Sequence, residues 1–253
     1  MSTSRTKENE PWSNASASFE SQGPNWEYLA NASFQEKWNS HWSRMLWQAF
    51  GRYIPEETSI LEIGCGTGKI SVQAVKYLGA KAVGIDVNYR LLEYARGLAG
   101  FVGVPATFLL GSGFEVPFTD KSFDVVLSEG VIEHFPAAQT DRMVAEHARV
   151  CRPGGRVLIS VPNLLNLPLT YHKLRTGKNY HDYPEKSYTV WQLSRLMRQH
   201  GLRAIAYSGF APAIGLEWFI HKRLRFRWFD RWAPNWLLAL MGYEVLVAAE
   251  KEA

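Results

Sequence analysis

The stretch LEIGCGTGK at residues 61–69 places three glycines at every second position, directly after an apolar run. Glycine suits backbone that must turn tightly or let a ligand come close. The residues before the glycines predict a short strand over 59–64, and the residues after them predict a helix over 68–79. A loop of this kind lies at the carboxyl end of its strand, where open α/β sheets bind ligands.

The rest of the chain continues this alternation of strands and helices. Apolar runs predict further strands at 81–87, 106–111, 123–130, 156–162, 202–210 and 242–251. Helical spacing of apolar residues predicts helices at 34–50, 88–100, 138–155 and 187–201. Residues 163–188 are expected to be irregular. Strands separated by helices of this length imply crossover connections, so we expect an α/β fold with a mostly parallel sheet.

The length and composition suit one large domain or a domain with an insertion. Of the 253 residues, 46% are hydrophobic and 21% are charged, which allows a sizeable core. Residues 1–24 are rich in Ser, Asn and Glu and are expected to be disordered. Residues 25–253 then form the domain, with a cofactor-binding half at 51–162, substrate-side insertions at 163–241 and a last strand at 242–253.

Charge, cysteine content and the N-terminal stretch bear on the expected partners and localisation of the protein. A net charge of +4 does not by itself call for nucleic acid as a partner. Two cysteines do not make a disulfide framework. Because the N-terminal stretch lacks the apolar core of a secretory signal and no run approaches about 18 apolar residues, we expect a cytoplasmic protein.

Two common phosphate-binding loops do not match the glycine stretch. A P-loop needs Ser or Thr where Ile70 stands and Gly where Ile63 stands. A dinucleotide fingerprint needs a third glycine where Lys69 stands. Asp86 follows Gly66 by twenty residues and ends a predicted strand, where a carboxylate accepts both ribose hydroxyls of an adenosine. The alternative is that Asp86 caps the next helix.

Four stretches together resemble, in order and spacing, the motifs of class I S-adenosylmethionine-dependent methyltransferases, and most of all the small-molecule group called methyltransferase type 11. They are LEIGCGTGK (61–69), GIDVN (84–88), SFDVVLSEGVIEHF (122–135) and RVCRPGGRVLISVPN (149–163). The resemblance implies a Rossmann-like sheet of seven mostly parallel strands, with helices on both faces and the last strand antiparallel. It also implies S-adenosyl-L-methionine as cofactor and a small-molecule acceptor.

The resemblance assigns residues to the parts of this cofactor. Around the methionine moiety it places Glu62, near the amino group, with Gly64, Cys65, Gly66 and Gly68. Asp86 would bind the ribose hydroxyls, and Val87 would line the adenine. Cys65 is interpreted as a small buried filler rather than a nucleophile.

The adenine and methyl ends of the site follow from the next two motifs. Ser112 stands where relatives often carry an Asp that binds the adenine amino group, and its hydroxyl is a weaker acceptor. Gly113 would donate its backbone N–H to the adenine ring, and Phe114 would stack on it. Glu129 and Gly130 would lie beside the methyl.

Methyl transfer from a sulfonium needs positioning of the nucleophile and exclusion of water. Transfer to carbon or to a poorly acidic hydroxyl also needs a base, for which the candidates are Glu129, Glu133 and His134. Among these residue types, histidine is the one whose ordinary pKa lies nearest neutral pH, which favours His134. The alternative is that Glu133 and His134 only orient the loop. No metal is expected, because Gly130 stands where metal-binding relatives carry an acid.

The acceptor should meet the segments outside the cofactor motifs. Trp38 and Trp42, on the aromatic face of the helix predicted at 34–50, are candidate acceptor contacts. Residues 217–241 mix Lys and Arg with Phe and Trp, which favours contact with a membrane surface or a lipid-linked substrate, or else a capping helix with solvated arginines. Both interpretations favour a hydrophobic or aromatic acceptor.

Two other functions stay open at this stage. The first is a non-catalytic S-adenosylmethionine-binding homologue or regulatory subunit. The second is a nicotinamide oxidoreductase, which Lys69 disfavours. No motif indicates a nucleic-acid substrate, and the sequence does not indicate the oligomeric state.

Overall fold

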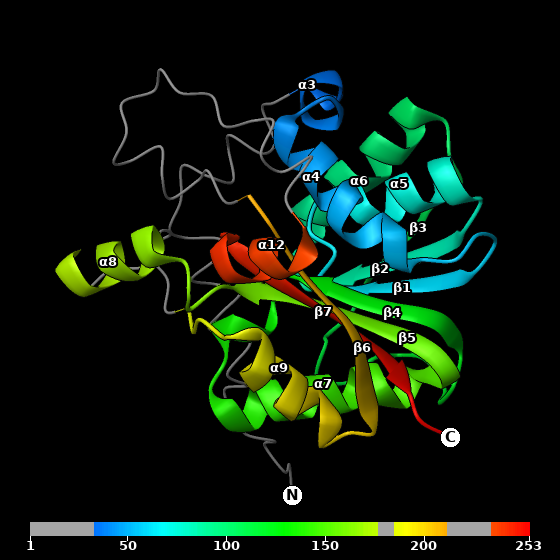
Figure 1. Ribbon diagram of the computed structural model, residues 1–253. Coiled ribbons are helices and arrows are strands. Elements are labelled where there is room, and N and C mark those ends of the chain that lie inside the picture. Colours follow the sequence, from blue (N-terminus) through cyan, green and yellow to red (C-terminus); the bar gives the residue numbers. More distant parts are fainter. Residues whose placement is uncertain (1–32, 177–184, 212–233) are drawn as a thin grey trace, which may run out of the picture.

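The structure is a computed structural model that describes residues 33–176, 185–211 and 234–253 (Figure 1). The described part is built on a seven-stranded sheet of order β3-β2-β1-β4-β5-β7-β6. Its strands are β1 (Ser59–Ile63), β2 (Lys81–Asp86), β3 (Thr107–Leu110), β4 (Phe123–Glu129), β5 (Cys151–Pro162), β6 (Leu202–Phe210) and β7 (Glu244–Lys251). Strands β1 to β5 pair in parallel, and β7 is antiparallel to both β5 and β6.

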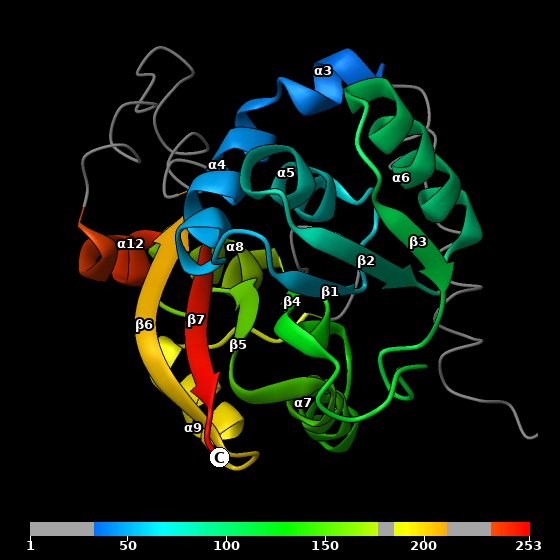
Figure 2. The ribbon, with the colours of Figure 1, turned by 90° about the vertical axis from the view of Figure 1, so that its right-hand side faces the viewer.

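Helices cover both faces of this sheet. They are α3 (Phe34–Trp38), α4 (His41–Phe50), α5 (Lys69–Leu78), α6 (Tyr89–Val102), α7 (Ala137–Val150), α8 (Leu167–Thr176), α9 (Val190–Arg198) and α12 (Asn235–Met241), with short 3₁₀ turns η1 (Gly51–Tyr53) and η2 (Ile132–His134). Figures 1 and 2 show α4, α5 and α6 on one face and α7 and α9 on the other. The Rossmann-like α/β fold with an antiparallel last strand is confirmed.

The central strands are apolar throughout because both of their faces are buried. In β4, Val125 and Leu127 join the core under α4 and α5, whereas Val126 joins the core under α7 and α9. In β5, Leu158 packs toward the first of these cores and Val157 toward the second. This arrangement explains why continuous apolar runs, rather than alternating ones, mark these strands.

The helix predicted over 138–155 ends earlier than its pattern suggests. Helix α7 ends at Val150, and Cys151 already has extended backbone at the start of β5. Pro153 disfavours helical backbone in the residue before it, and Gly154 has a φ of +70° that suits glycine. The pairing register between β4 and β5 shifts at this point.

Two other segments differ from the sequence expectation. The single helix predicted over 34–50 is two helices, because Ser40 caps α4 by accepting the N–H of Ser43 at 3.0 Å. The segment predicted to be irregular over 163–188 contains α8, whose first turn is capped by Asn166 accepting the N–H of Leu169 at 2.9 Å. In both places a polar cap residue defines a helix start that apolar spacing does not reveal.

Some sequence expectations lie outside the described residues. These are the disorder expected over 1–24 and most of the basic and aromatic segment 217–241, of which the described end forms α12. Within the described ranges, no helix is both long and apolar enough to cross a membrane.

Candidate functional site

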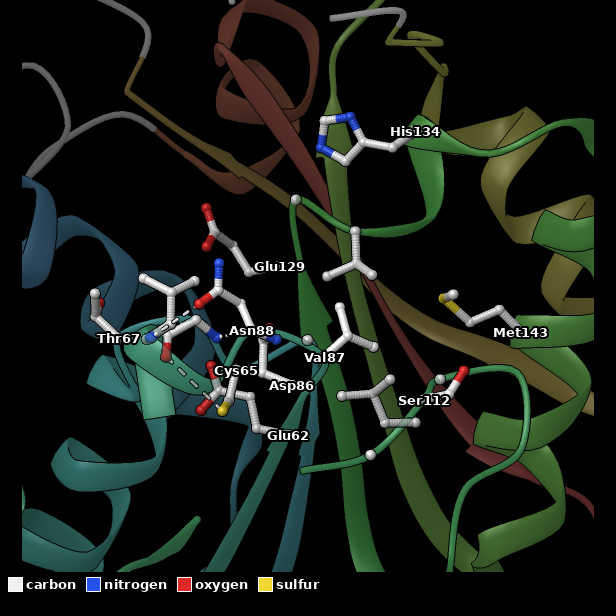
Figure 3. Close-up of a pocket in the computed structure, with 18 of the residues that line it drawn as sticks. Glu62, Cys65, Thr67, Asp86, Val87, Asn88, Ser112, Glu129, His134 and Met143 are labelled. Carbon is white, nitrogen blue, oxygen red and sulfur yellow. Dashed lines mark hydrogen bonds between the residues drawn. The ribbon is translucent and has the colours of Figure 1, made fainter. Parts of the chain in front are cut away.

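A cavity of about 350 Å³ opens at the carboxyl ends of β1, β2 and β4 (Figure 3). Its walls come from the glycine loop, the ends of these strands and the loop after β3. Of the residues proposed from sequence, those that line it are Glu62, Gly64, Cys65, Gly66, Asp86, Val87, Ser112, Gly113, Phe114, Glu129, Gly130 and His134. The structure therefore brings together residues from three of the four motifs and from the loop after β3.

The glycine loop has a backbone that other residues rarely adopt. Gly64, Gly66 and Gly68 have φ values of +66°, +50° and +68°. A Cβ on Gly64 would lie 2.6 Å from a methyl carbon of Val131. A Cβ on Gly66 would meet no atom of the chain within 4 Å, so this glycine leaves the cavity side of the loop open.

Gly68 faces the protein interior instead of the cavity. A Cβ there would lie 2.6 Å from the ring of Phe108 and 2.9 Å from Ala95, so Gly68 lets the start of α5 pack against β3 and α6. Cys65 lines the cavity but is only 5% exposed, and it packs against Gly84. Burial raises the pKa of the Cys65 thiol, which fits a packing residue rather than a nucleophile.

Asp86 is held by backbone N–H groups on both carboxylate oxygens. Gly66 donates to Oδ2 and Asn88 donates to Oδ1, each at 2.8 Å. The cap of α6 is Asn88, whose side chain accepts the N–H groups of Arg90 and Leu91 at 3.0 and 3.2 Å. Asp86 is therefore not the helix cap. Since each carboxylate oxygen carries two lone pairs, Asp86 keeps the capacity to accept hydroxyl groups.

Glu62 is a buried acid at the floor of the cavity, with 4% of its surface exposed. Both hydrogen bonds from Ser71, one from N–H at 3.0 Å and one from the hydroxyl at 2.5 Å, go to Oε2. Burial raises the pKa of Glu62 to about 8. A buried carboxyl whose second oxygen is left for another donor is suited to a cationic group.

The loop after β3 forms the opposite end of the cavity. The hydroxyl of Ser112 accepts the N–H of Phe114 at 3.2 Å. A Cβ on Gly113 would lie 2.8 Å from a methyl carbon of Ile63, so the backbone passes close to β1 here. The ring of Phe114 packs edge-to-face on Phe135, with centroids 4.8 Å apart.

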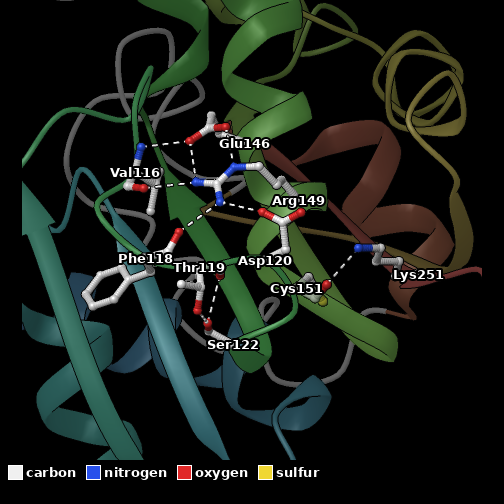
Figure 4. A network of polar contacts seen from close by, with 9 residues as sticks. All are labelled: Val116, Phe118, Thr119, Asp120, Ser122, Glu146, Arg149, Cys151 and Lys251. Atoms are coloured by element: carbon white, nitrogen blue, oxygen red, sulfur yellow. Dashed lines mark hydrogen bonds and ion pairs between the residues drawn. The ribbon is translucent and has the colours of Figure 1, made fainter.

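Arg149 on α7 fixes the continuation of this loop (Figure 4). Its guanidinium donates to the carbonyl oxygens of Val116 and Phe118 at 2.9 and 2.8 Å, and to Asp120 at 2.8 Å. Glu146 pairs with Arg149 at 2.7 Å and accepts the N–H of Val116 at 2.7 Å. The loop that supplies Ser112 to Phe114 is thus tied to a helix by a planar donor that matches several acceptors at once.

Charged groups meet at the end of β4. Lys69, the first residue of α5, lines the cavity and faces Glu129 and Glu62, whose charges oppose the lowering of the Lys69 pKa by burial. His134 lines the cavity, and its Nε2 lies 3.7 Å from Oε1 of Glu133. Glu133 is 3% exposed and lies behind the cavity wall. Burial raises the pKa of Glu133 well above its usual range.

Sequence reasoning did not select Lys69 as a site residue. In the sequence, Lys69 served only to exclude a dinucleotide-binding loop. Its position could have indicated a site residue, because a residue directly after the glycine loop lies in the first turn of the next helix, beside the cavity. Other lining residues that were not selected are Leu46, Ile63, Thr67, Ile70, Asn88, Leu91, Gly111, Val131, Phe135 and Met143.

The two candidate acceptor tryptophans do not line the cavity. Trp38 stacks on Tyr77 with ring centroids 6.0 Å apart. Trp42 packs edge-on against Phe210 at 5.5 Å and Tyr243 at 6.5 Å. Contact between the acceptor and either tryptophan remains a prediction. Across the described ranges, no group of three or more His, Cys, Asp or Glu side chains is placed to hold a metal ion.

Comparison with known proteins agrees with this geometry. Residues 61–159 match the family model described as a methyltransferase domain. An uncharacterized methyltransferase of Mycobacterium sp. strain KMS is 32% identical over 196 residues, which cover 76% of this chain and 72% of that relative. A demethylmenaquinone methyltransferase of Tropheryma whipplei is 34% identical over 122 residues, which cover 48% of each chain.

Solved structures share the fold at low sequence identity. A methyltransferase solved in complex with the Trm112 methyltransferase activator of Haloferax volcanii has a TM-score of 0.66 at 17% identity, covering 92% of this chain and 99% of that one. Magnesium protoporphyrin IX methyltransferase from Synechocystis, solved with bound SAH, has a TM-score of 0.65 at 16% identity, covering 95% and 100%. The chain belongs to the class I S-adenosylmethionine-dependent methyltransferases, and its cofactor is S-adenosylmethionine.

Proposed function

We propose that this methyltransferase acts on a small hydrophobic or aromatic acceptor, including one attached to a lipid. The observation that carries the proposal is the apolar surface of α8 and α12. Large apolar side chains that are exposed on or beside these helices are Leu164, Leu167, Tyr171, Leu174, Trp236, Leu240 and Met241. Leu167 and Leu174 are 77% and 81% exposed, which is unusual for leucine on one short helix.

This apolar surface lies at the edge of the sheet that holds the cavity. Helix α8 follows the carboxyl end of β5, and α12 precedes the start of the antiparallel β7, so topology brings both helices to the same edge. The side chain of Asn166 joins them, because its Nδ2 donates to the carbonyl oxygen of Met241 at 3.0 Å. An apolar acceptor would therefore meet apolar surface on its way to the cavity.

One relative supports an acceptor of this kind. The Tropheryma whipplei protein that matches about half of the chain is by its name a demethylmenaquinone methyltransferase, so its acceptor is a quinone derivative. The acceptor of the present chain is a proposal that rests on its own α8 and α12.

The residues that line the cavity suit the three parts of the cofactor. Glu62 would bind the ammonium group, Asp86 the ribose hydroxyls, and Val87 with Phe114 the adenine faces. When bound, S-adenosylmethionine supplies a methyl group that is already activated on a sulfonium. The chain's own tasks are then to orient the acceptor, exclude water and, where the acceptor carries a proton, remove it through Glu129 or His134.

Calorimetry followed by an acceptor panel tests this proposal. We expect S-adenosylmethionine and its demethylated product to bind, and NAD not to bind. With a labelled methyl group, lipid-linked quinols and phenols should gain label, whereas water-soluble amines should not. Label on the amines alone would contradict the proposed acceptor class. Binding of the cofactor without label on any acceptor would favour the alternative, a non-catalytic cofactor-binding homologue.

A further inference from the structure

Glu244, the first residue of β7, lies against the candidate base Glu129. Glu129 is the pairing partner of Ser160 in the β4–β5 ladder, and the hydroxyl of Ser160 binds Glu244, so both glutamates flank Ser160 and their carboxyl groups meet in a side-chain hydrogen bond. Glu244 is 5% exposed, and its Oε2 accepts the hydroxyl of Ser160 on β5 at 2.5 Å. Glu129 ends β4 and projects into the cavity (Figure 3). The order β4-β5-β7 in the sheet creates this contact between residues that lie far apart in sequence.

A hydrogen bond between two carboxyl groups requires a proton. An ionised carboxylate only accepts hydrogen bonds, so one member of the pair must be protonated to donate to the other. Two ionised carboxylates in contact in a buried site would also repel each other strongly. The contact between Glu129 and Glu244 therefore defines a pair that holds one proton.

The surroundings decide which carboxyl group holds this proton. Burial raises the pKa of Glu129, but Lys69 beside it opposes this shift and favours the ionised form. Glu244 is fully enclosed and faces the acidic groups Glu129 and Glu133, so its ionised form is disfavoured. The charged groups that face the pair or its immediate neighbours come from several elements and are Glu62, Lys69, Glu133, Lys173 and Glu185.

We propose that Glu244 holds the proton and donates it in a hydrogen bond to Glu129, which keeps Glu129 ionised as the proton acceptor for the group that receives the methyl. This inference rests on the proposed function and narrows it to acceptors that lose a proton, such as a hydroxyl or an enol. The acceptor atom forms a bond to the methyl carbon, the sulfur–methyl bond breaks with its electron pair going to sulfur, and the acceptor's proton passes to Glu129. Glu244 is then a positioning residue.

Titration of the glutamate carboxyl groups tests the pair directly. The protein would be labelled with carbon-13 at these carboxyl groups and followed by NMR from acid to alkaline pH. The wild type should show two coupled ionisations, the second at distinctly higher pH. Glu244→Gln imitates the protonated side chain, because its amide donates to Glu129. It should remove the upper ionisation and leave that of Glu129 in place.

A matched control and a second variant keep the test decisive. Glu250→Gln makes the same substitution at the exposed far end of β7, where Glu250 pairs with Arg203, and should keep both ionisations of the pair. Glu129→Gln should move the ionisation of Glu244 to lower pH, because the neighbouring charge is gone. If Glu244 ionises at the same pH in Glu129→Gln as in the wild type, the proposal is overturned, even if Glu244→Gln does not fold.

The remaining outcomes separate this inference from the proposed function. A shift of the Glu129 ionisation by about one pH unit or more in Glu244→Gln would show that Glu244 is ionised in the native protein, and would overturn the proposal. Calorimetry with S-adenosylmethionine on the same samples reports on the function. If the protein binds S-adenosylmethionine but Glu129 and Glu244 ionise independently, the shared proton is contradicted and the proposed function is not. If the protein does not bind S-adenosylmethionine, the proposed function is contradicted.

Discussion

At the scale of the residue, the glycine loop shows that three similar positions have different tasks. All three glycines need positive φ, but only Gly64 and Gly66 line the cavity, while Gly68 packs on Phe108 and Ala95. Their alternation in the sequence predicts the turn. It does not tell which glycine faces the ligand, because that depends on where α6 and β3 lie.

Alanine at two of these positions should therefore affect stability and cofactor binding to different extents. Gly68→Ala combines strained backbone with a close contact to Phe108 and should lower the free energy of unfolding by about 3 kcal/mol. Gly66→Ala has only the backbone cost, about 1–2 kcal/mol, but its methyl group would project where the cofactor approaches. Urea unfolding and calorimetry with S-adenosylmethionine measure both effects. Equal losses of stability would contradict the inward orientation of Gly68.

Asp86 offers a second test at this scale. Asp86→Ala removes the proposed acceptor of the ribose hydroxyls and the bond that holds the N–H of Gly66 at 2.8 Å. We expect affinity for S-adenosylmethionine to fall about tenfold or more, which corresponds to about 1.4 kcal/mol or more. Asp141→Ala on α7, an exposed acid paired with His200, is a control that should bind normally. Unchanged affinity of Asp86→Ala would mean that the ribose lies elsewhere.

At the scale of the element, periodicity predicted the strands and most helices because burial on one or both faces determines where apolar residues fall. It could not predict the break between α3 and α4 or the end of α7, since single polar or proline residues decide these boundaries. The order and spacing of the motifs predicted that Glu62, Asp86 and Glu129 share one site, and all three line the same cavity. It could not find Glu244, because a long-range sheet pairing alone puts that residue beside Glu129.

The loop tied by Arg149 gives a prediction at this scale. Arg149→Met keeps the aliphatic stem but loses the bonds to Val116, Phe118, Asp120 and Glu146. Because the side chain is 31% exposed, water replaces part of the loss, and we expect a destabilisation of about 1–2 kcal/mol. Thermal unfolding measures it.

The control for this loop is another surface arginine. Arg203 pairs only loosely with Glu250, at 3.3 Å and with 60% of its side chain exposed. Arg203→Met should change stability by no more than about 0.5 kcal/mol. Similar effects of the two substitutions would mean that the network of Arg149 does not stabilise the loop. Weaker cofactor binding in Arg149→Met alone would link the loop to the adenine end of the cavity.

At the scale of the whole molecule, buried ionisable groups should make stability depend on pH in opposite directions. His147 joins α7 to β4, with Nδ1 at 2.7 Å from the carbonyl oxygen of Met143 and Nε2 at 3.0 Å from the hydroxyl of Ser128. Burial lowers the pKa of His147 to about 4. The unfolded chain therefore binds more protons than the folded one between about 6.5 and 4, so this contribution to stability is lost as the pH falls through that window.

Glu62 changes the stability with pH in the opposite direction. Burial raises its pKa to about 8, so between about 4.5 and 8 the folded chain binds the extra proton and stability falls as the pH rises. Each group contributes a slope of up to about 1.4 kcal/mol per pH unit within its window. Urea unfolding across pH should show a smaller loss of stability toward acid pH in His147→Gln, and a smaller loss of stability with rising pH between about 4.5 and 8 in Glu62→Gln. An acid slope that persists in His147→Gln would mean that other groups control the acid side.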